Sequence, residues 1–146
     1  MQCMQGRGGG GAIVSGGAVE CWGDDTYGQL GDDTFTSSST PVAVSGVTGA
    51  TVIAAGSDQA CAIVAGGAVT CWGSNYWGEL GNGALTRPTG VRTTIAGLTG
   101  ATAISCGFQQ TCALLSAGGI ECWGMDSAGE LGNGVEAALG AVGVVW

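Results

Sequence analysis

Short apolar segments alternate with glycine-rich turns along the chain, a pattern typical of β-strands joined in hairpins. One such hairpin is centred on residues 65–67. If Cys61 pairs with Cys71 across it, three loop residues remain, and the third is a glycine, which takes the left-handed conformation that such loops need. Residues 15–17 and 116–118 fit the same register. The pattern therefore predicts three equivalent β-hairpins.

Both faces of the central hairpin are apolar. Side chains alternate between the two faces of a strand. The register therefore puts Cys61, Ile63, Val69 and Cys71 on one face, and Ala62, Val64 and Trp72 on the other. A sheet that is apolar on both sides suits stacking between neighbouring sheets, as blades stack in a propeller, better than exposure of one face to water.

Further apolar segments precede the second and third hairpins. They are residues 42–44 and 50–54 before the second, and residues 93–95 and 101–105 before the third. Together with the hairpins they give four short strands in each period. The polar segments 32–41 and 82–92 differ between copies, and we expect them to be surface loops, the usual place for recognition.

A sequence signature follows each hairpin. The motif Cys-Trp-Gly begins at Cys21, Cys71 and Cys122, so the copies lie 50 and 51 residues apart, and each leads into Gly-x-Leu-Gly. A period of this length indicates stacked units that cannot bury their apolar faces alone. We expect the tryptophans to pack in the core or between blades with their indole N–H seeking a carbonyl, the glycines to form turns and the leucines to be buried. These scaffold positions are Trp22, Gly23, Leu30, Trp72, Gly73, Leu80, Trp123, Gly124 and Leu131.

The fold class expected is all-β, a partial β-propeller of four-stranded blades built from about two and a half repeats. We expect a disordered glycine-rich start at residues 1–10 and tandem repeats over 11–134, divided at about 11–60, 61–111 and 112–134. Residues 135–146 are interpreted as the truncated start of a further blade. Because propellers close with ~4 to 8 blades, this stretch alone is too short to close a ring.

Charge narrows the classes of partner. The formal net charge is −8, from three arginines and eleven carboxylates, with no lysine and no histidine. Nucleic acid is therefore a poor partner, because binding a phosphate backbone depends on clustered basic side chains. No apolar run approaches the length of a membrane span, and residues 1–11 do not resemble a signal peptide.

Seven cysteines are heavy usage for 146 residues. The pairs Cys61/Cys71 and Cys112/Cys122 face each other in the proposed register, so we expect two disulfides and an extracellular or cell-surface location. The alternative is that they are reduced, small core residues of a cytoplasmic protein. The remaining cysteines are Cys3, Cys21 and Cys106, of which Cys3 and Cys21 can reach each other through a flexible segment. A zinc site is disfavoured because there is no Cys-x-x-Cys and no histidine.

The carboxylates do not indicate catalysis or a cofactor. Asp24, Asp25, Asp32 and Asp33 suggest calcium at first sight, but the other copies carry Ser, Asn, Gly or Met at several of these positions. Such residues are better explained by hydrogen bonds to their own turn. With no histidine or lysine and no gathered acid pair, we expect a non-enzyme without cofactor or metal.

Some aromatic residues do not repeat. Tyr76, Trp77 and Phe108, together with Arg87, are the candidates for an exposed binding surface, since aromatic and arginine side chains concentrate at interaction hot spots. The alternative is that these rings cover the edge of a blade.

The segment from Gln59 to Asn82, with its Cys-Ala-Ile, Gly-Ala-Val-Thr-Cys-Trp-Gly and Gly-Glu-Leu-Gly-Asn stretches, resembles the regulator of chromosome condensation repeat in its cysteine-bearing bacterial form. The resemblance extends over residues 11–134, with Gly11 standing where the first hairpin should have a cysteine. It implies a propeller in which strands of adjacent repeats complete each blade. The family includes an exchange factor for the small GTPase Ran and a secreted bacterial inhibitor of β-lactamases.

Together these observations predict a non-catalytic module for protein or glycan interaction, acting through loops 32–41 and 82–92, as a fragment of a larger secreted or surface propeller of a bacterium. One alternative is an inert structural fragment. Another, by family analogy alone, is a propeller-type enzyme inhibitor or a guanine-nucleotide exchange factor. Open blade edges also predict association between copies of the chain.

Overall fold

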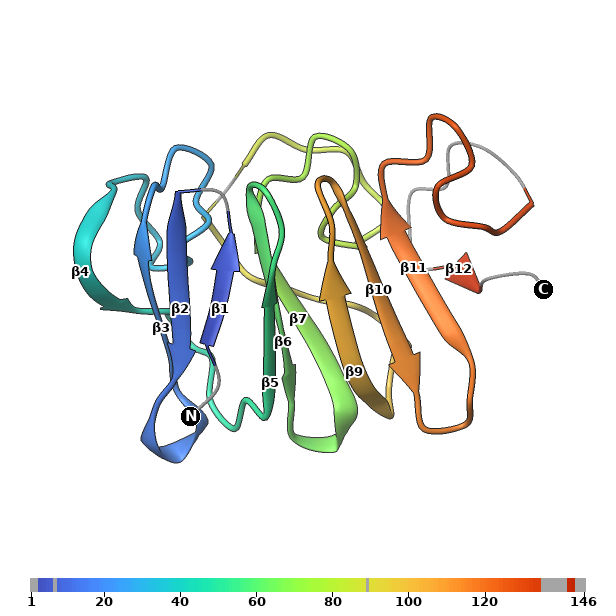
Figure 1. Ribbon diagram of the computed structural model, residues 1–146, viewed down its shortest axis with the longest axis horizontal. Helices are drawn as coiled ribbons and strands as arrows, with labels where there is room; N and C mark the ends of the chain where they lie inside the picture. The colour runs from blue at the N-terminus through green and yellow to red at the C-terminus, as the bar shows by residue number, and fades with distance from the viewer. Residues whose placement is uncertain (1–2, 7, 89, 135–141, 144–146) are drawn as a thin grey trace.

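The computed structural model describes residues 3–6, 8–88, 90–134 and 142–143, and it folds them into three four-stranded antiparallel sheets that stand side by side (Figure 1). The first sheet contains β1 (Cys3–Gly6), β2 (Gly9–Ile13), β3 (Val19–Gly23) and β4 (Ser38–Ala43). The second contains β5 (Val52–Ala55), β6 (Gln59–Val64), β7 (Ala68–Gly73) and β8 (Thr93–Thr94). The third contains β9 (Ala101–Cys106), β10 (Gln110–Leu115), β11 (Ile120–Gly124) and β12 (Val142–Gly143). Short 3-10 turns cover Ser15–Gly17 and Ala65–Gly67.

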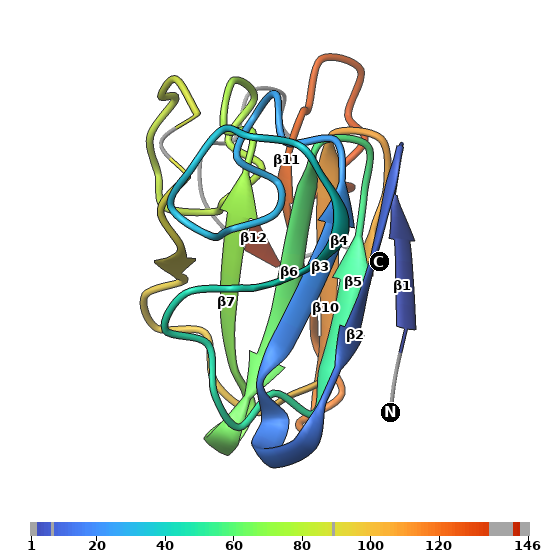
Figure 2. The same cartoon turned by 90° about the vertical axis from the view of Figure 1, so that its left-hand side faces the viewer.

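Each sheet is a propeller blade with its strands in chain order. The all-β class and the four-stranded blades are therefore confirmed, and the described residues make three blades where the sequence suggested two and a half repeats. Strand β5 contacts β1 of the first sheet and β9 of the third, so the first strands of the sheets lie on the same side of the array, whereas β4, β8 and β12 are the opposite edges of the three sheets (Figure 2).

The hairpin register is also confirmed. Cys61 lies opposite Cys71, Ile63 opposite Val69 and Val64 opposite Ala68. Gly67 closes the turn at a φ of +74°, the left-handed value that favours glycine. In the first blade Gly11 lies opposite Cys21, which is the expected gap in the cysteine pattern.

The core is divided between the blades. Cys61, Ile63, Val69 and Cys71 belong to one buried cluster, which includes Trp123 of the third blade. Ala60, Ala62 and Trp72 belong to another, which includes Val19 and Cys21 of the first blade. The central sheet is therefore buried on both faces, as its two-sided apolar pattern predicts.

The connections lie at two opposite ends of the blades. Hairpin turns such as Ala65–Gly67 lie at one end (Figure 1). The other end, which we call the loop face, is formed by residues 24–37, 56–58, 74–88, 107–109 and 125–134. No helix in the part of the chain that the structure describes is long and apolar enough to cross a membrane.

Three expectations about boundaries are wrong. Residues 3–6 and 9–10 lie in β1 and β2, so the start is not disordered where it is described, because these residues pair with a neighbouring strand despite their lack of an apolar pattern. The predicted loop 32–41 ends at residue 37, since Ser38 already pairs with Gly23 in β4. Residues 142–143 pair with β11 as the fourth strand of the third blade and do not begin another; the rest of 135–146 lies outside the described residues.

Candidate interaction surface

An acid or amide side chain fixes the turn after each hairpin. The Leu80 N–H donates to Asn75 Oδ1 at 3.0 Å, and the same bond joins Leu30 to Asp25 (2.8 Å) and Leu131 to Asp126 (3.1 Å). Asp24 and Asp32 likewise accept from the N–H two residues further along. The interpretation of these residues as turn formers is therefore confirmed, apart from Asp33, which pairs with Arg92 at 2.7 Å.

The residue at position x of Gly-x-Leu-Gly accepts hydrogen bonds through both its side chain and its main-chain carbonyl. Glu79 is fully buried; its carboxylate accepts from the Ser74 hydroxyl at 2.9 Å and from the Trp77 N–H at 2.8 Å. Its main-chain oxygen accepts from Trp123 Nε1 at 2.8 Å. Trp72 Nε1 makes the same bond, at 2.9 Å, to the oxygen of Gln29. Each of these tryptophans therefore reaches the turn of the preceding copy.

The last glycine of the motif makes room for that tryptophan. A Cβ on Gly31 would lie 2.8 Å from Cδ1 of Trp72, and one on Gly81 would lie 3.0 Å from Cδ1 of Trp123. The signature therefore joins consecutive blades. The sequence indicated a buried tryptophan that seeks a carbonyl; it gave no signal for which carbonyl, because the acceptor is a backbone atom that any residue supplies.

Both predicted disulfides are formed, Cys61–Cys71 and Cys112–Cys122. Cys21 is a free, buried thiol, so it is not bridged to Cys3. Burial raises the pKa of Cys21 to about 12, with a further contribution from the carboxylates of Asp25 and Asp32. Burial also raises the pKa of the partly buried Cys106 to about 11, and its sulfur accepts from the Thr111 hydroxyl.

Among the described residues, the buried carboxylates gather into no metal-binding group, and the space beside Cys21 between the first two blades is small. Within the described ranges, no three histidine, cysteine, aspartate or glutamate side chains gather where they could hold a metal ion. A cavity of about 30 Å³ lies between the first two blades, beside Cys21 and Trp22, which is room for about one water molecule. Gly9 lines this cavity and occupies the repeat position that Gln59 has in the second blade. At the next interface, the side-chain amide of Gln59 fills the equivalent space and donates to the Gly107 oxygen at 3.3 Å.

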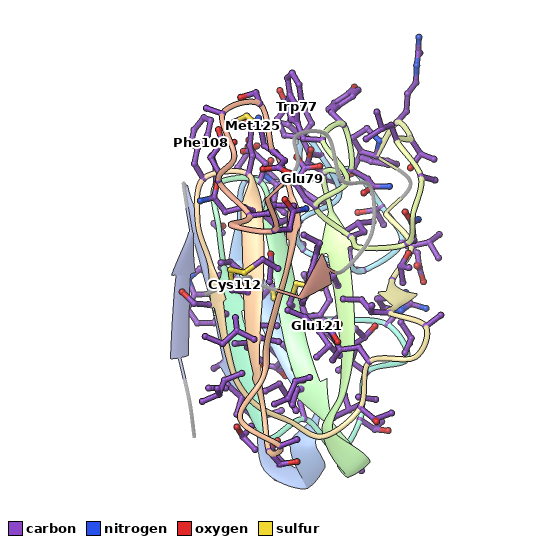
Figure 3. All side chains as sticks on the ribbon, turned by 90° about the vertical axis from the view of Figure 1, so that its right-hand side faces the viewer. Trp77, Glu79, Phe108, Cys112, Glu121 and Met125 are labelled. Carbon is purple, nitrogen blue, oxygen red and sulfur yellow. A yellow bond between two sulfur atoms is a disulfide. The ribbon has the colours of Figure 1, made fainter. Side chains whose placement is uncertain are left out.

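The non-repeating aromatic residues gather on the loop face. Tyr76, Trp77 and Phe108 are 49%, 47% and 60% exposed, and Trp77 and Phe108 lie at the same end of the molecule as Met125 (Figure 3). The rings of Tyr76 and Tyr27 meet edge to face, with centroids 6.2 Å apart, so this contact joins the loops of two blades. Arg87 is exposed in the same β7–β8 connection as Tyr76. Sequence reasoning did not single out Phe35 or Leu85, which are also exposed on this face.

Comparison with known proteins agrees with this geometry. Residues 17–63 match the model of the regulator of chromosome condensation (RCC1) repeat. Residues 17–63 form an RCC1-type repeat. No curated protein sequence matches the chain.

Solved structures share the RCC1 blade arrangement. Human WBSCR16 superposes with a TM-score of 0.86 at 20% identity, over 99% of this chain and 37% of that one. Prp20p from Saccharomyces cerevisiae, whose binding to Gsp1p and histones has been described, gives 0.83 at 18% identity over 98% and 38%. The ectodomain of the Physcomitrella patens receptor kinase CR4 gives 0.55 at 25% identity over 91% and 31%. The chain therefore spans less than two fifths of the length of these proteins.

Proposed function

We propose that this chain is a non-catalytic RCC1-repeat module that binds a protein through its loop face, as part of a larger extracellular or cell-surface propeller. The main support for this proposal is the group of exposed rings formed by Tyr76, Trp77 and Phe108. They come from two separate connections, β7–β8 and β9–β10, on one face. Exposed aromatic side chains are enriched in protein interfaces and rarely gather on a surface without a use.

Repeating and non-repeating residues have different roles in the structure, and this difference supports the proposal. Residues that repeat, such as Trp72 and Leu80, are buried and engaged in joining blades. The exposed rings stand at positions that change from copy to copy, so their presence is not explained by the needs of the scaffold. Prp20p, which has the same blade arrangement, is a protein whose binding to Gsp1p and histones has been described.

The electrostatics of the loop face favour a partner with a basic surface. Hydrogen bonds, the largest from the Ala128 N–H, hold the pKa of the exposed Glu130 below its usual range. The Thr26 hydroxyl does the same for Asp24. Both are therefore ionised at neutral pH, in a chain of net charge −8. Complementary charge speeds association more than it tightens a complex, so we expect the on-rate to fall as salt is raised.

The buried carboxylates support a role without catalysis. Asp25 and Glu79 accept hydrogen bonds that hold the turns, which accounts for their burial without a catalytic role. The two disulfides are compatible with an extracellular location, where such bridges persist.

Site-specific photo-crosslinking tests the proposal. A benzophenone amino acid replaces Trp77 in one variant and Phe108 in another, and a control variant carries it at Thr40, which is exposed on the edge strand β4. We expect the two loop-face variants to capture the same protein at the cell surface and the control to capture none. Equal capture at Thr40, or capture of glycan alone, would overturn the proposal.

A matched pair of variants tests the contribution of the rings. The triple variant Tyr76→Ala/Trp77→Ala/Phe108→Ala should abolish binding of the captured protein. The control Ser39→Ala/Thr40→Ala/Pro41→Ala removes as many exposed side chains from β4 and should bind as the wild type does. Both should remain folded. The triple variant should lose about 1–3 kcal/mol of unfolding free energy, because its rings are about half exposed and Tyr76 contacts Tyr27, and the control should stay within about 1 kcal/mol of the wild type.

A further inference from the structure

Cys106 is a free cysteine that the repeat pattern does not explain. It is the last residue of β9, and the second blade has Ala55 at the same position, the last residue of β5. The strand pairing confirms the equivalence, since Cys106 lies opposite Thr111 as Ala55 lies opposite Ala60. A blade can therefore be built without a cysteine at this position.

The Cys106 side chain faces the disulfide of the second blade. It packs against the buried cluster between the second and third blades, which contains Cys61 and Cys71. The next residue fixes its place along this interface, because Gln59 Nε2 donates to the Gly107 oxygen at 3.3 Å. Cys61 follows Gln59 by two residues, so both side chains point to the same face of β6. Cα atoms of β6 and β9 also approach within 8 Å of one another.

The preceding interface lacks both the bridge and the third cysteine. Gly11 stands there in place of Cys61, which leaves Cys21 as a free, buried thiol. Ala55 stands in place of Cys106 and lines the same small cavity as Cys21, so these positions meet across the interface. A cysteine that only filled space would be of most use where this cavity remains. The additional thiol instead accompanies the interface that has a disulfide.

We propose that Cys106 is a thiol–disulfide exchange site for the Cys61–Cys71 bridge. The Cys106 thiol gives its proton to water, its thiolate attacks Cys61 Sγ, and a Cys61–Cys106 bond forms as the Cys61–Cys71 bond breaks. Cys71 leaves as a thiolate and takes up a proton. The number of disulfides does not change, so the step consumes no oxidant and no reductant.

The exchange changes which elements the bridge connects. Cys61–Cys71 joins β6 to β7 within the second blade, at a sequence separation of 10. A Cys61–Cys106 bridge joins the second blade to the third and closes a longer loop, which constrains the unfolded chain more. The exchanged form therefore holds two blades together covalently. This inference does not rest on the loop-face proposal, since it uses other residues.

Burial makes the exchange slow. It raises the pKa of Cys106 to about 11, so little of the attacking thiolate is present at neutral pH. Uncatalysed disulfide rearrangement takes minutes to hours even in general, and we expect this one to be at the slow end of that range. The two bridged forms are therefore long-lived and can be separated and mapped.

A trapped variant tests whether the two sulfurs meet. Cys71→Ser leaves Cys61 and Cys106 as free thiols, which a glutathione redox buffer should join. The effective concentration of this pair, measured against glutathione, should be at least ~10-fold higher in the folded protein than in urea, because the fold and not chain flexibility brings them together. Cys71→Ser/Cys106→Ser is the control and should form no such bridge. Equal values with and without urea would overturn the proposal.

Bridge mapping in the wild type tests the exchange itself and needs no variant to fold. The protein is incubated at mildly alkaline pH without added thiol, quenched with acid, and its free thiols are blocked before peptide mass spectrometry. We expect a growing fraction of molecules with a Cys61–Cys106 bridge and a blocked Cys71. Cys106→Ser should keep Cys61–Cys71 in every molecule, and Cys21→Ser should exchange as the wild type does. A wild type that keeps Cys61–Cys71 throughout, with Cys106 always blocked, would make Cys106 a packing residue and overturn the proposal.

Discussion

At the residue scale, Trp72 illustrates how one repeated side chain serves two blades. Its ring lies against Gly31 and its N–H donates to the Gln29 oxygen, both in the preceding blade, while its own strand belongs to the second. An unpaired indole N–H in a dry interface is costly, so this bond contributes specificity as well as packing. The neighbouring Trp77 is 47% exposed and has no comparable role in the scaffold.

The free thiol of Cys21 predicts a specific pH dependence of stability. Because burial raises its pKa in the folded protein from 9.0 to about 12, the folded state holds this proton more tightly than the unfolded state does. The resulting stabilisation is present below pH 9 and is lost as pH rises from about 9 towards 12. In urea unfolding, the wild type should lose about 1 kcal/mol more than Cys21→Ala between pH 8 and pH 10. Parallel losses in the two proteins would show that this thiol has an ordinary pKa.

At the element scale, the hairpins follow from local sequence. The loop glycine at position 67 and the facing cysteines specify one register between them, and a shift by one residue would turn every apolar side chain to the wrong face. Strands without such local signals were not predictable. β1 and the first half of β4 are polar or glycine-rich, and they are strands because a neighbouring strand supplies their hydrogen-bond partners.

The first hairpin predicts an engineered bridge. Gly11 lies opposite Cys21 in the register that places Cys61 opposite Cys71, so Gly11→Cys should form a third disulfide. The bridge should raise the unfolding free energy by about 2–3 kcal/mol, since it closes a loop of the same length as the native pair does. The measurement is urea unfolding with and without reductant.

Gly11→Ser is the control for this bridge, because it also replaces a flexible glycine but cannot form a disulfide. Both variants gain from the loss of glycine entropy in the unfolded chain, and only Gly11→Cys should lose its additional stability on reduction. Equal stability of the two variants under oxidising conditions would mean that the two positions do not face each other as described.

At the scale of the whole molecule, three blades form an array in which both internal interfaces are packed with buried side chains. The repeat period, the signature and the two-sided apolar pattern were enough to predict this architecture. They did not reveal that the signature acts between copies, because Trp72 and its acceptor Gln29 are 43 residues apart and the acceptor is a main-chain atom. Nor did they reveal that Trp77 and Phe108 share a face. That depends on the β7–β8 and β9–β10 connections lying at the same end of the blades.

The same arrangement separates stability from recognition. The residues common to all copies, such as Trp72 and Leu80, are buried between the blades, and the exposed rings of Tyr76, Trp77 and Phe108 lie on connections that differ between copies. The loop face of this chain can therefore change without disturbing the blades, because loops tolerate substitution far better than packed interfaces do.

A double-mutant cycle between Gly31 and Trp72 tests most directly whether the signature couples consecutive blades. Gly31 has a φ of +66° and lies under the Trp72 ring, so Gly31→Ala should cost both backbone strain and a steric clash. Gly83→Ala is its control, because Gly83 has a φ of +74° with nothing within 4 Å of an added Cβ. Unfolding free energies should show Gly31→Ala and Trp72→Ala to be non-additive by about 1 kcal/mol, since removing the ring relieves the clash.

The corresponding cycle between Gly31 and Trp22, which belong to the same copy, should be additive within about 0.5 kcal/mol. Coupling of Gly31 to Trp22 with additivity towards Trp72 would contradict the account, because it would place the signature within one blade and leave the array without the contact that joins its members.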